Sequence, residues 1–430
     1  MARLDIQRCE LCPFAHAKPT KLKINTPPSF TLQSTIKNPT QSSNTILEKG
    51  YRNHVTKDTH STYSKQTAQT NWRTPVNIIW THMLVACTEP TTFQTIDIID
   101  TAYTVAERSI DTLSDPRSMQ GDLGDLYVGG IFRMDWSTGD LVYDEGRPLQ
   151  VQYQTIDGTA HPVDRDGLIA FSYYAHLEDT VSFLESSESD WDGLLPMNTA
   201  ISPIISDISL AFLPMENAAY VPTLHHFLLL TDAVPKSVPL AANKGVVAHE
   251  FGHAIFHYLT TGDTTSERLL PIGAEGFNSV YSLDEGLADV LGYLVTGRSD
   301  FIGDSLTDQD RALDGEHLAI EVDTLPANYT DDGLLSSYNP YDLGSVFAAT
   351  IWEVSDATNN PTQMLRWIIE TTRTFGQEIR NEVREDDVNL GMQWLDIWVS
   401  ISPSDEHSQL ACTAIESRWM DVYEVAACSE

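Results

Sequence analysis

The chain has few basic residues, and this shortage limits the partners that it can bind. Its 430 residues include 26 Lys and Arg against 61 Asp and Glu, a formal net charge of −35 at pH 7. Residues 1–80 carry 11 of the basic and 4 of the acidic residues, which leaves 15 basic and 57 acidic residues for the rest. Such an acidic body argues against nucleic acid and anionic membranes as partners. It suits a soluble exported protein, although acidity that serves solubility alone gives the same composition.

Cysteines are also scarce, with five in the chain. Cys9 and Cys12 form one CxxC pair with His16 nearby, but no second pair follows at a metal-binding spacing, so we expect no zinc finger there. Cys412 and Cys428 lie 16 residues apart near the C-terminus. In an exported protein we expect a disulfide between them, and in the cytosol two free thiols.

Residues 1–80 lack the apolar periodicity of a folded domain and are rich in Ser, Thr, Asn, Gln, Lys and Pro. The apolar run over 76–87 that follows is far too short to span a membrane as a helix. It ends in Leu84-Val85-Ala86-Cys87, which resembles the cleavage box of bacterial lipoproteins, where the cysteine carries the lipid. The resemblance implies that residues 1–87 are a leader, that translation starts after Met1 and that Cys87 anchors an exported protein. An accidental match is the alternative.

The most informative motif is His249-Glu250-Phe251-Gly252-His253, inside an apolar run that predicts a helix over 244–260. Histidines four residues apart lie one turn apart on the same face of a helix. Their imidazoles can hold one zinc ion, and Glu250 is placed to take a proton from a zinc-bound water. The alternative is that both histidines are ordinary half-buried residues with hydrogen-bonded rings.

A catalytic zinc ion usually has a third protein ligand, and the helix predicted over 282–295 offers one. Glu285 and Asp289 are four residues apart in this otherwise apolar segment, so they share one face. A carboxylate in apolar surroundings is costly unless a positive charge faces it. We therefore expect Glu285 to bind the metal and Asp289 to orient the ring of His249 through its N–H group. A solvated acidic face on a surface helix is the alternative.

An HExxH motif followed by a helix with E-G-x-x-D is similar to the signature of the gluzincin metallopeptidases, the thermolysin-like and fungalysin-like enzymes. The likeness covers roughly residues 165–355. It implies a zinc peptidase, most simply an endopeptidase acting on proteins or peptides. In such an enzyme Zn²⁺ is held by His249, His253 and Glu285, and Glu250 is the catalytic base.

The same resemblance implies a fold of the α+β class, the two-lobed zincin fold. Its mixed α/β N-lobe would cover 88–262 and carry the zinc helix, and its mainly helical C-lobe would cover 263–430. The sequence has no internal repeat. The hydrophobic pattern itself predicts a hairpin over 127–143, a helix or mixed segment over 91–113, and helices over 166–185, 343–354, 362–375, 388–401 and 413–423.

A third similarity lies upstream, where Asn217-Ala218-Ala219-Tyr220 resembles the edge strand that holds the substrate backbone in thermolysin-like enzymes. It implies that Asn217 and Ala218 bind substrate.

The sequence departs from the family in two places. Glu285 follows His253 by 32 residues, longer than in thermolysin, which implies an inserted loop over 260–277.

The second departure concerns the oxyanion. The family places a histidine in the C-lobe to stabilise it, and here Tyr341 stands where that histidine is expected. A phenol can donate the same hydrogen bond. Tyr281 and Tyr258 are rival donors.

Two other functions remain open. Met215-Glu216-Asn217 is similar to the element with which gluzincin aminopeptidases bind the substrate amine, in which case Glu216 would bind it. Leu213-Pro214 in place of the Gly-Ala of that family argues against this. The chain could also be a surface binding module that keeps the zincin fold without catalytic activity. This would explain the missing C-lobe histidine, but a protein without activity has no need of a catalytic base such as Glu250.

The acidic composition is compatible with bound calcium as a further cofactor, but it does not indicate where calcium would bind. The best acidic run lacks the helix–loop–helix calcium pattern, because Ala312 and Leu313 stand where a ligand and a glycine are required. The run consists of Asp300, Asp304, Asp308, Asp310 and Asp314.

Overall fold

The computed structural model describes most of the chain after the expected leader, which itself lies outside the described residues together with Cys87. The described residues are 89–99, 102–135, 140–187, 193–202, 204–205, 217–230, 238–261, 274–306, 311–322, 338–381, 387–419 and 422–429. Among them no helix has the length and apolar character needed to cross a membrane.

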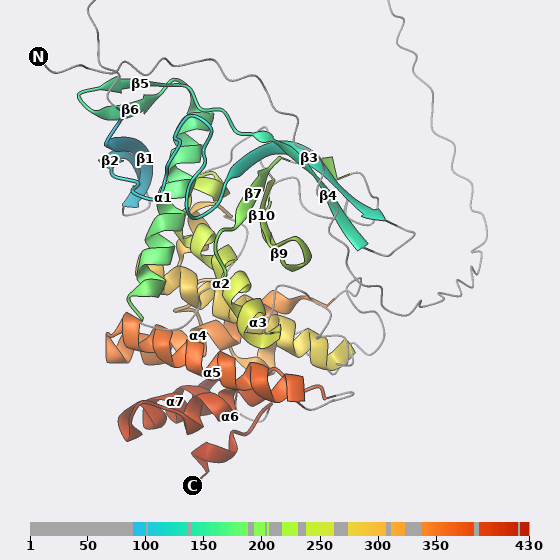
Figure 1. The fold of residues 1–430 in the computed structure, drawn as a ribbon. Coiled ribbons are helices and arrows are strands. Elements are labelled where there is room, and N and C mark those ends of the chain that lie inside the picture. Colours follow the sequence, from blue (N-terminus) through green and yellow to red (C-terminus); the bar gives the residue numbers. More distant parts are fainter. Residues whose placement is uncertain are drawn as a thin grey trace, which may run out of the picture. The chain divides into compact units, whose positions relative to one another are not determined.

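The described part is an α+β fold with two mixed sheets and seven α-helices (Figure 1). The first sheet has the strand order β2-β1-β6-β5, and the second β4-β3-β7-β10-β9, with β8 paired to β3. The strands are β1 (Thr92–Ile99), β2 (Ala102–Arg108), β3 (Leu126–Asp135), β4 (Asp140–Pro148), β5 (Tyr153–Ile156), β6 (Thr159–Pro162), β7 (Asn198–Ile201), β8 (Ile204–Ile205), β9 (Asn217–Val221) and β10 (His226–Leu230).

The segment 91–113, which is predicted to be a helix or a mixed segment, forms the antiparallel pair of β1 and β2, so the helix is wrong. The segment is rich in β-branched Thr and Ile, which fit a pleated surface better than a helix. Helix α1 (Arg165–Glu185) covers this sheet, and the backbone N–H of Ile96 donates a hydrogen bond of 2.8 Å to Ser172 Oγ. The hairpin predicted over 127–143 is confirmed as β3 and β4.

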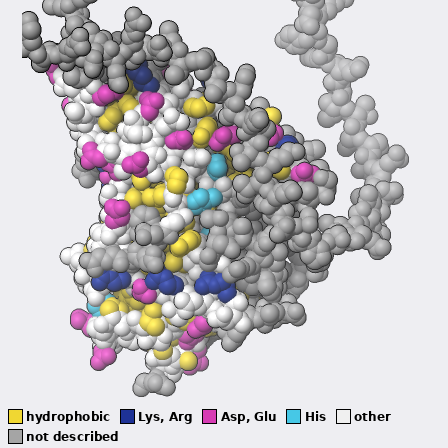
Figure 2. Space-filling model, viewed as in Figure 1, with side chains coloured by type: hydrophobic (Ala, Val, Ile, Leu, Met, Phe, Trp, Pro, Cys, Tyr) yellow, Lys and Arg dark blue, Asp and Glu magenta, His cyan; other side chains and the backbone are white. Residues whose placement is uncertain are grey.

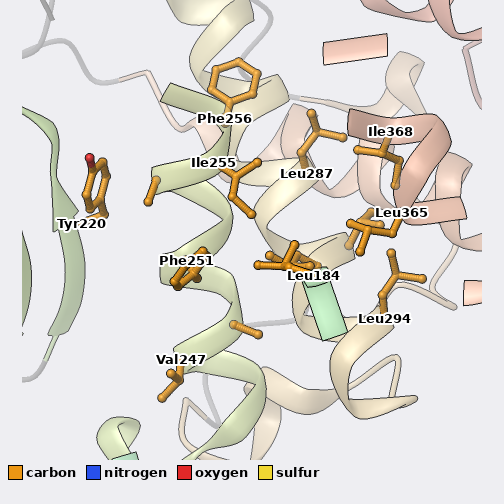
Figure 3. Packing of buried hydrophobic residues seen from close by; sticks show 14 of the residues in the cluster. Leu184, Tyr220, Val247, Phe251, Ile255, Phe256, Leu287, Leu294, Leu365 and Ile368 are labelled. Atoms are coloured by element: carbon orange, nitrogen blue, oxygen red, sulfur yellow. The ribbon is translucent and has the colours of Figure 1, made fainter. Parts of the chain in front are cut away.

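Helix α2 (Lys244–Thr261) is the centre of the molecule, since it packs against α1, β9, α3 (Ala274–Thr296) and α5 (Pro361–Asn381). Figure 3 shows the apolar side of this packing, where Ile255 of α2 lies near Leu287 of α3. One core cluster runs from the first sheet to the C-terminal helices. The helix predicted over 244–260 is therefore confirmed, and it is buried on nearly every side.

The C-terminal helices differ from the prediction only in their ends. They are α4 (Pro340–Thr358), α5, α6 (Gln393–Ser400) and α7 (Asp405–Trp419). Helix α7 starts eight residues earlier than predicted because Ser404 precedes it and its Oγ accepts a hydrogen bond from the His407 N–H. Helix α3 starts at Ala274, so the insertion expected over 260–277 is shorter than predicted.

A disulfide joins Cys412 in α7 to Cys428, with their Cα atoms 5.4 Å apart. The pairing expected for an exported protein is thus present in the structure. The surface in Figure 2 has acidic side chains scattered over its described parts, while many of its basic side chains gather in one row across the helical half. The excess of acidic residues in the sequence is therefore displayed on this face.

Candidate metal centre

The start of α2 is fixed by Asn243 and Phe301. The Asn243 side-chain oxygen accepts hydrogen bonds from the N–H groups of Gly245 and Val246, at 3.0 and 3.4 Å. Its amide nitrogen donates to the Phe301 carbonyl and to Ser305 Oγ, at 2.8 and 2.9 Å. Asn243 therefore caps the helix and also ties it to the segment that follows α3.

A close approach between α2 and α3 brings the predicted site residues together. A Cβ atom added to Gly252 would lie 2.7 Å from Ala288 Cα, a distance that no real side chain tolerates. The two helices can therefore cross at this point only because residue 252 is glycine. On α2 the crossing lies between His249 and His253, and on α3 it lies next to Glu285 and Asp289.

Three side chains meet at this crossing and could hold a metal ion. The Nε2 atoms of His249 and His253 are 3.1 Å apart. Glu285 Oε2 lies 3.5 Å from the first and 3.7 Å from the second. Glu285 Oε2 is buried and accepts no hydrogen bond from the described residues. The three residues that the sequence predicts as metal ligands thus point the atoms that could bind a metal at one small space.

Each histidine of the group is oriented by its own carboxylate. His249 Nδ1 lies 2.8 Å from Asp289 Oδ1, as predicted. His253 Nδ1 lies 2.9 Å from Asp284 Oδ1, a contact that the sequence reasoning missed. Both Nδ1 atoms face a carboxylate, so both Nε2 atoms are left to face the metal position.

The second residue that sequence reasoning missed is Arg311, whose side chain is 9% exposed. It binds Asp289 through two hydrogen bonds, of 2.7 and 3.1 Å. One of its nitrogens lies 3.5 Å from Glu285 Oε2, and its guanidinium carbon lies 4.1 Å from the centre of the Tyr341 ring. Arg311 therefore compensates buried negative charge and also packs on the aromatic residue expected to act on substrate.

The charges of the group shift one another strongly. Burial disfavours a charged His253, but Asp284 and Glu285 outweigh that effect and raise its pKa to about 10. Burial raises the pKa of Glu285, but His253, His249 and Arg311 together lower it below its usual value. Glu285 is therefore held as a carboxylate, the form that can bind a metal ion.

Glu250 lies on the same turn of α2 and is buried, with 7% of its surface exposed. Burial raises the pKa of its carboxyl, while the nearby His249 and His253 lower it. Its Oε2 has no hydrogen-bond partner among the described residues. This oxygen is thus left to act on a proton.

The three tyrosines proposed as oxyanion donors lie in different places. Tyr341 is in the first turn of α4, where the charge of Glu285 and burial raise its pKa. A close approach of Gly286 to the Gly344 carbonyl, where an added Cβ would lie 2.6 Å from the oxygen, brings α4 to α3. Tyr281 is one turn before Glu285 and 36% exposed, whereas the hydroxyl of Tyr258 lies next to Gly193.

The strand expected to hold substrate is an edge strand. Within the described residues β9, which begins at Asn217, pairs only with β10, and Ala218 lies opposite Leu229. It also contacts α2. Glu216, the residue on which an aminopeptidase would depend, lies outside the described residues.

The acidic run considered for calcium is partly neutralised by the protein. Arg298 forms ion pairs with Asp300 and Asp304. Asp308 and Asp310 lie outside the described residues.

Comparisons with known proteins add no relative to this picture. No model of a known protein family matches the chain, and no curated protein is similar to it in sequence.

Proposed function

We propose that this chain is a zinc-dependent peptidase, an endopeptidase with the two-lobed zincin fold. The observation that carries the proposal is the buried group of His249, His253 and Glu285, with the carboxyl of Glu250 on the same helix turn. A structural metal site has no need of such a carboxyl beside it, but a hydrolytic site does.

The distances within the group support zinc. Zinc binds imidazole nitrogen and carboxylate oxygen at about 2.0–2.2 Å in a tetrahedron, so neighbouring ligand atoms lie roughly 3.3–3.5 Å apart. The observed separations are 3.1, 3.5 and 3.7 Å. Three protein ligands also leave the fourth position open for water or substrate, as in catalytic sites.

When bound, zinc would acidify a water molecule and polarise the scissile carbonyl. Glu250 accepts the proton of the attacking water and delivers it to the leaving amine, and the pKa raised by burial helps it to hold that proton between the two steps. Asp289 and Asp284 keep the two imidazoles in the tautomer that directs Nε2 to the metal. The Tyr341 hydroxyl donates a hydrogen bond to the oxyanion.

Substrate is expected to bind as an added strand along the free edge of β9. Within the described residues β9 pairs only with β10, so its other edge can take a substrate strand. The main-chain groups of Asn217 and Ala218 would make these contacts.

The test replaces Glu250 by Gln in the full chain and measures both zinc content and cleavage of a quenched protein substrate. We expect cleavage to fall by at least about a hundredfold, the scale of a lost general base, with one zinc per chain retained. The matched control is Glu370→Gln, an exposed residue of α5 that pairs with Arg373. Equal cleavage by the Glu250 variant and the control would refute the proposal.

An aminopeptidase is distinguished by the substrate. N-acetylation of a peptide should leave endopeptidase cleavage unchanged and abolish aminopeptidase cleavage. We also propose that the protein is exported and anchored through a lipid on Cys87. This part of the proposal concerns where the enzyme works and not its chemistry.

A further inference from the structure

A histidine outside the metal group sits at the turn of the β9–β10 hairpin. His225 has a φ angle of +52°, in the left-handed region that few residues with side chains adopt. Its Nε2 atom lies 2.7 Å from the Leu194 carbonyl oxygen, and its Nδ1 atom lies 2.9 Å from the Tyr220 hydroxyl. Both ring nitrogens are therefore engaged, one by each neighbouring segment.

The chemistry of the two partners fixes the direction of both hydrogen bonds. A carbonyl oxygen can only accept, so Nε2 carries the hydrogen. In the neutral ring Nδ1 is then an acceptor, and the Tyr220 hydroxyl donates to it. Burial lowers the pKa of His225, which favours this neutral form. The ring thus connects Tyr220 to the Leu194 backbone in a defined orientation.

Tyr220 is the residue that joins β9 to the metal helix. Its ring is 8% exposed and meets the ring of His257 on α2 edge to face, with centroids 6.3 Å apart. It packs in the same way against Phe227 of β10, at 5.9 Å. A shift of Tyr220 therefore moves the edge strand relative to α2, the helix that carries Glu250.

We propose that His225 is a positioning residue that holds Tyr220, and through it places the edge strand β9 against α2. Neither His225 nor the Tyr220 hydroxyl is among the three residues of the metal group, so both act through other residues. The effect on catalysis rests on the proposed function, but the effect on β9 does not.

Four variants of the full chain test this. Tyr220→Phe removes only the hydroxyl, and His225→Ala removes the whole relay. His225→Asn keeps a residue that tolerates the left-handed region but is too short for the relay, so it controls for backbone strain. His225→Gln restores one donor and one acceptor and is the rescue variant.

The first measurement is hydrogen exchange at the amides of β9, with exchange at β10 as the internal reference. We expect about tenfold faster exchange in β9 in the Phe, Ala and Asn variants, the scale of one lost hydrogen bond, and near-normal exchange in the Gln variant. The double variant of Tyr220→Phe and His225→Ala should be no worse than either single one, because both remove the same contact. Unchanged exchange in β9 would overturn the inference, whether or not any peptide is cleaved.

The second measurement is peptide cleavage. We expect kcat to fall about tenfold in the Phe, Ala and Asn variants, with zinc content unchanged and partial recovery in the Gln variant. A purely structural role predicts instead that β9 and β10 loosen together, that kcat per folded molecule stays constant and that Gln gives no rescue. A wild-type protein that binds zinc but cleaves nothing would refute the proposed function, and the exchange measurement would still decide the role of His225.

Discussion

Replacing Gly252 by Ala should damage the metal site without changing any ligand. The added Cβ would lie 2.7 Å from Ala288 Cα and 3.2 Å from Ala288 Cβ, where ordinary contact needs 3.4–4 Å. The closest atom belongs to the backbone of α3, so no side-chain rotation relieves the clash. The two helices must therefore separate by roughly 1 Å, which as an overpacked core position costs about 1–3 kcal/mol of folding free energy.

The separation acts directly on the ligand group, since two ligands are on α2 and the third is on α3. The distances from Glu285 Oε2 to the histidine nitrogens, now 3.5 and 3.7 Å, would grow to about 4.5 Å. A site of this kind must keep its geometry to about 0.5 Å, so we expect zinc affinity to fall by about a hundredfold or more.

The assay is competition between the protein and a zinc chelator, together with urea unfolding of the zinc-free protein. Gly303→Ala is the matched control, because an added Cβ there meets no atom within 4 Å. The control should bind zinc and unfold like the wild type. Wild-type zinc affinity in the Gly252 variant would refute the reasoning that this crossing sets the geometry of the site.

Other changes have equally defined outcomes. Asp284→Ala should weaken zinc binding by about 10–100-fold in the same competition assay, because His253 loses the partner that orients its ring; unchanged affinity would remove Asp284 from the site. Tyr341→Phe should lower kcat by about a hundredfold with zinc content unchanged, and a fully active variant would transfer the oxyanion role elsewhere. Burial lowers the pKa of His176 to about 4 from an ordinary value of 6.5, so the unfolded chain binds more protons than the folded one between these values. Stability should therefore fall as the pH drops from 6.5 to 4, by up to about 3 kcal/mol from this group, and urea unfolding of His176→Phe should lack that part of the loss. Reduction of the Cys412–Cys428 disulfide should cost about 3 kcal/mol in the same unfolding assay, given its 16-residue separation, and no change would show that the bond does not constrain the unfolded chain.

The metal group could be predicted from the sequence because helical periodicity is local. Residues four apart on an apolar helix share a face, and this places His249 with His253 and Glu285 with Asp289. The structure brings the four together, and it pairs Asp289 with His249 as expected.

The residues that were missed depend on how α2 and α3 cross in space. Along α2 the contacts move from His249 to His253, while along α3 they move backwards from Asp289 to Asp284. An antiparallel crossing therefore supplies a carboxylate to each histidine, and Asp284, directly before Glu285, is the signal that could have been used. Arg311 follows α3 in a segment without periodicity, and no local pattern links it to the site.

Strands β1 and β2 were not predicted because the segment has no clear hydrophobic period. Between residues 91 and 113 the buried positions do not follow one clear period, since Phe93, Thr95 and Ile96 are all buried. Helix and strand could not be separated there by pattern alone. Strand β1 is stabilised by packing against α1 and by pairing with β6.

Zinc content of the purified full chain, measured together with cleavage of a quenched protein substrate before and after chelation, decides whether the chain is a zinc peptidase. We expect one zinc per chain, cleavage that stops when the metal is removed, and recovery when zinc is returned. A folded protein that binds no zinc, or cleavage that continues after its zinc has been removed, would contradict this expectation.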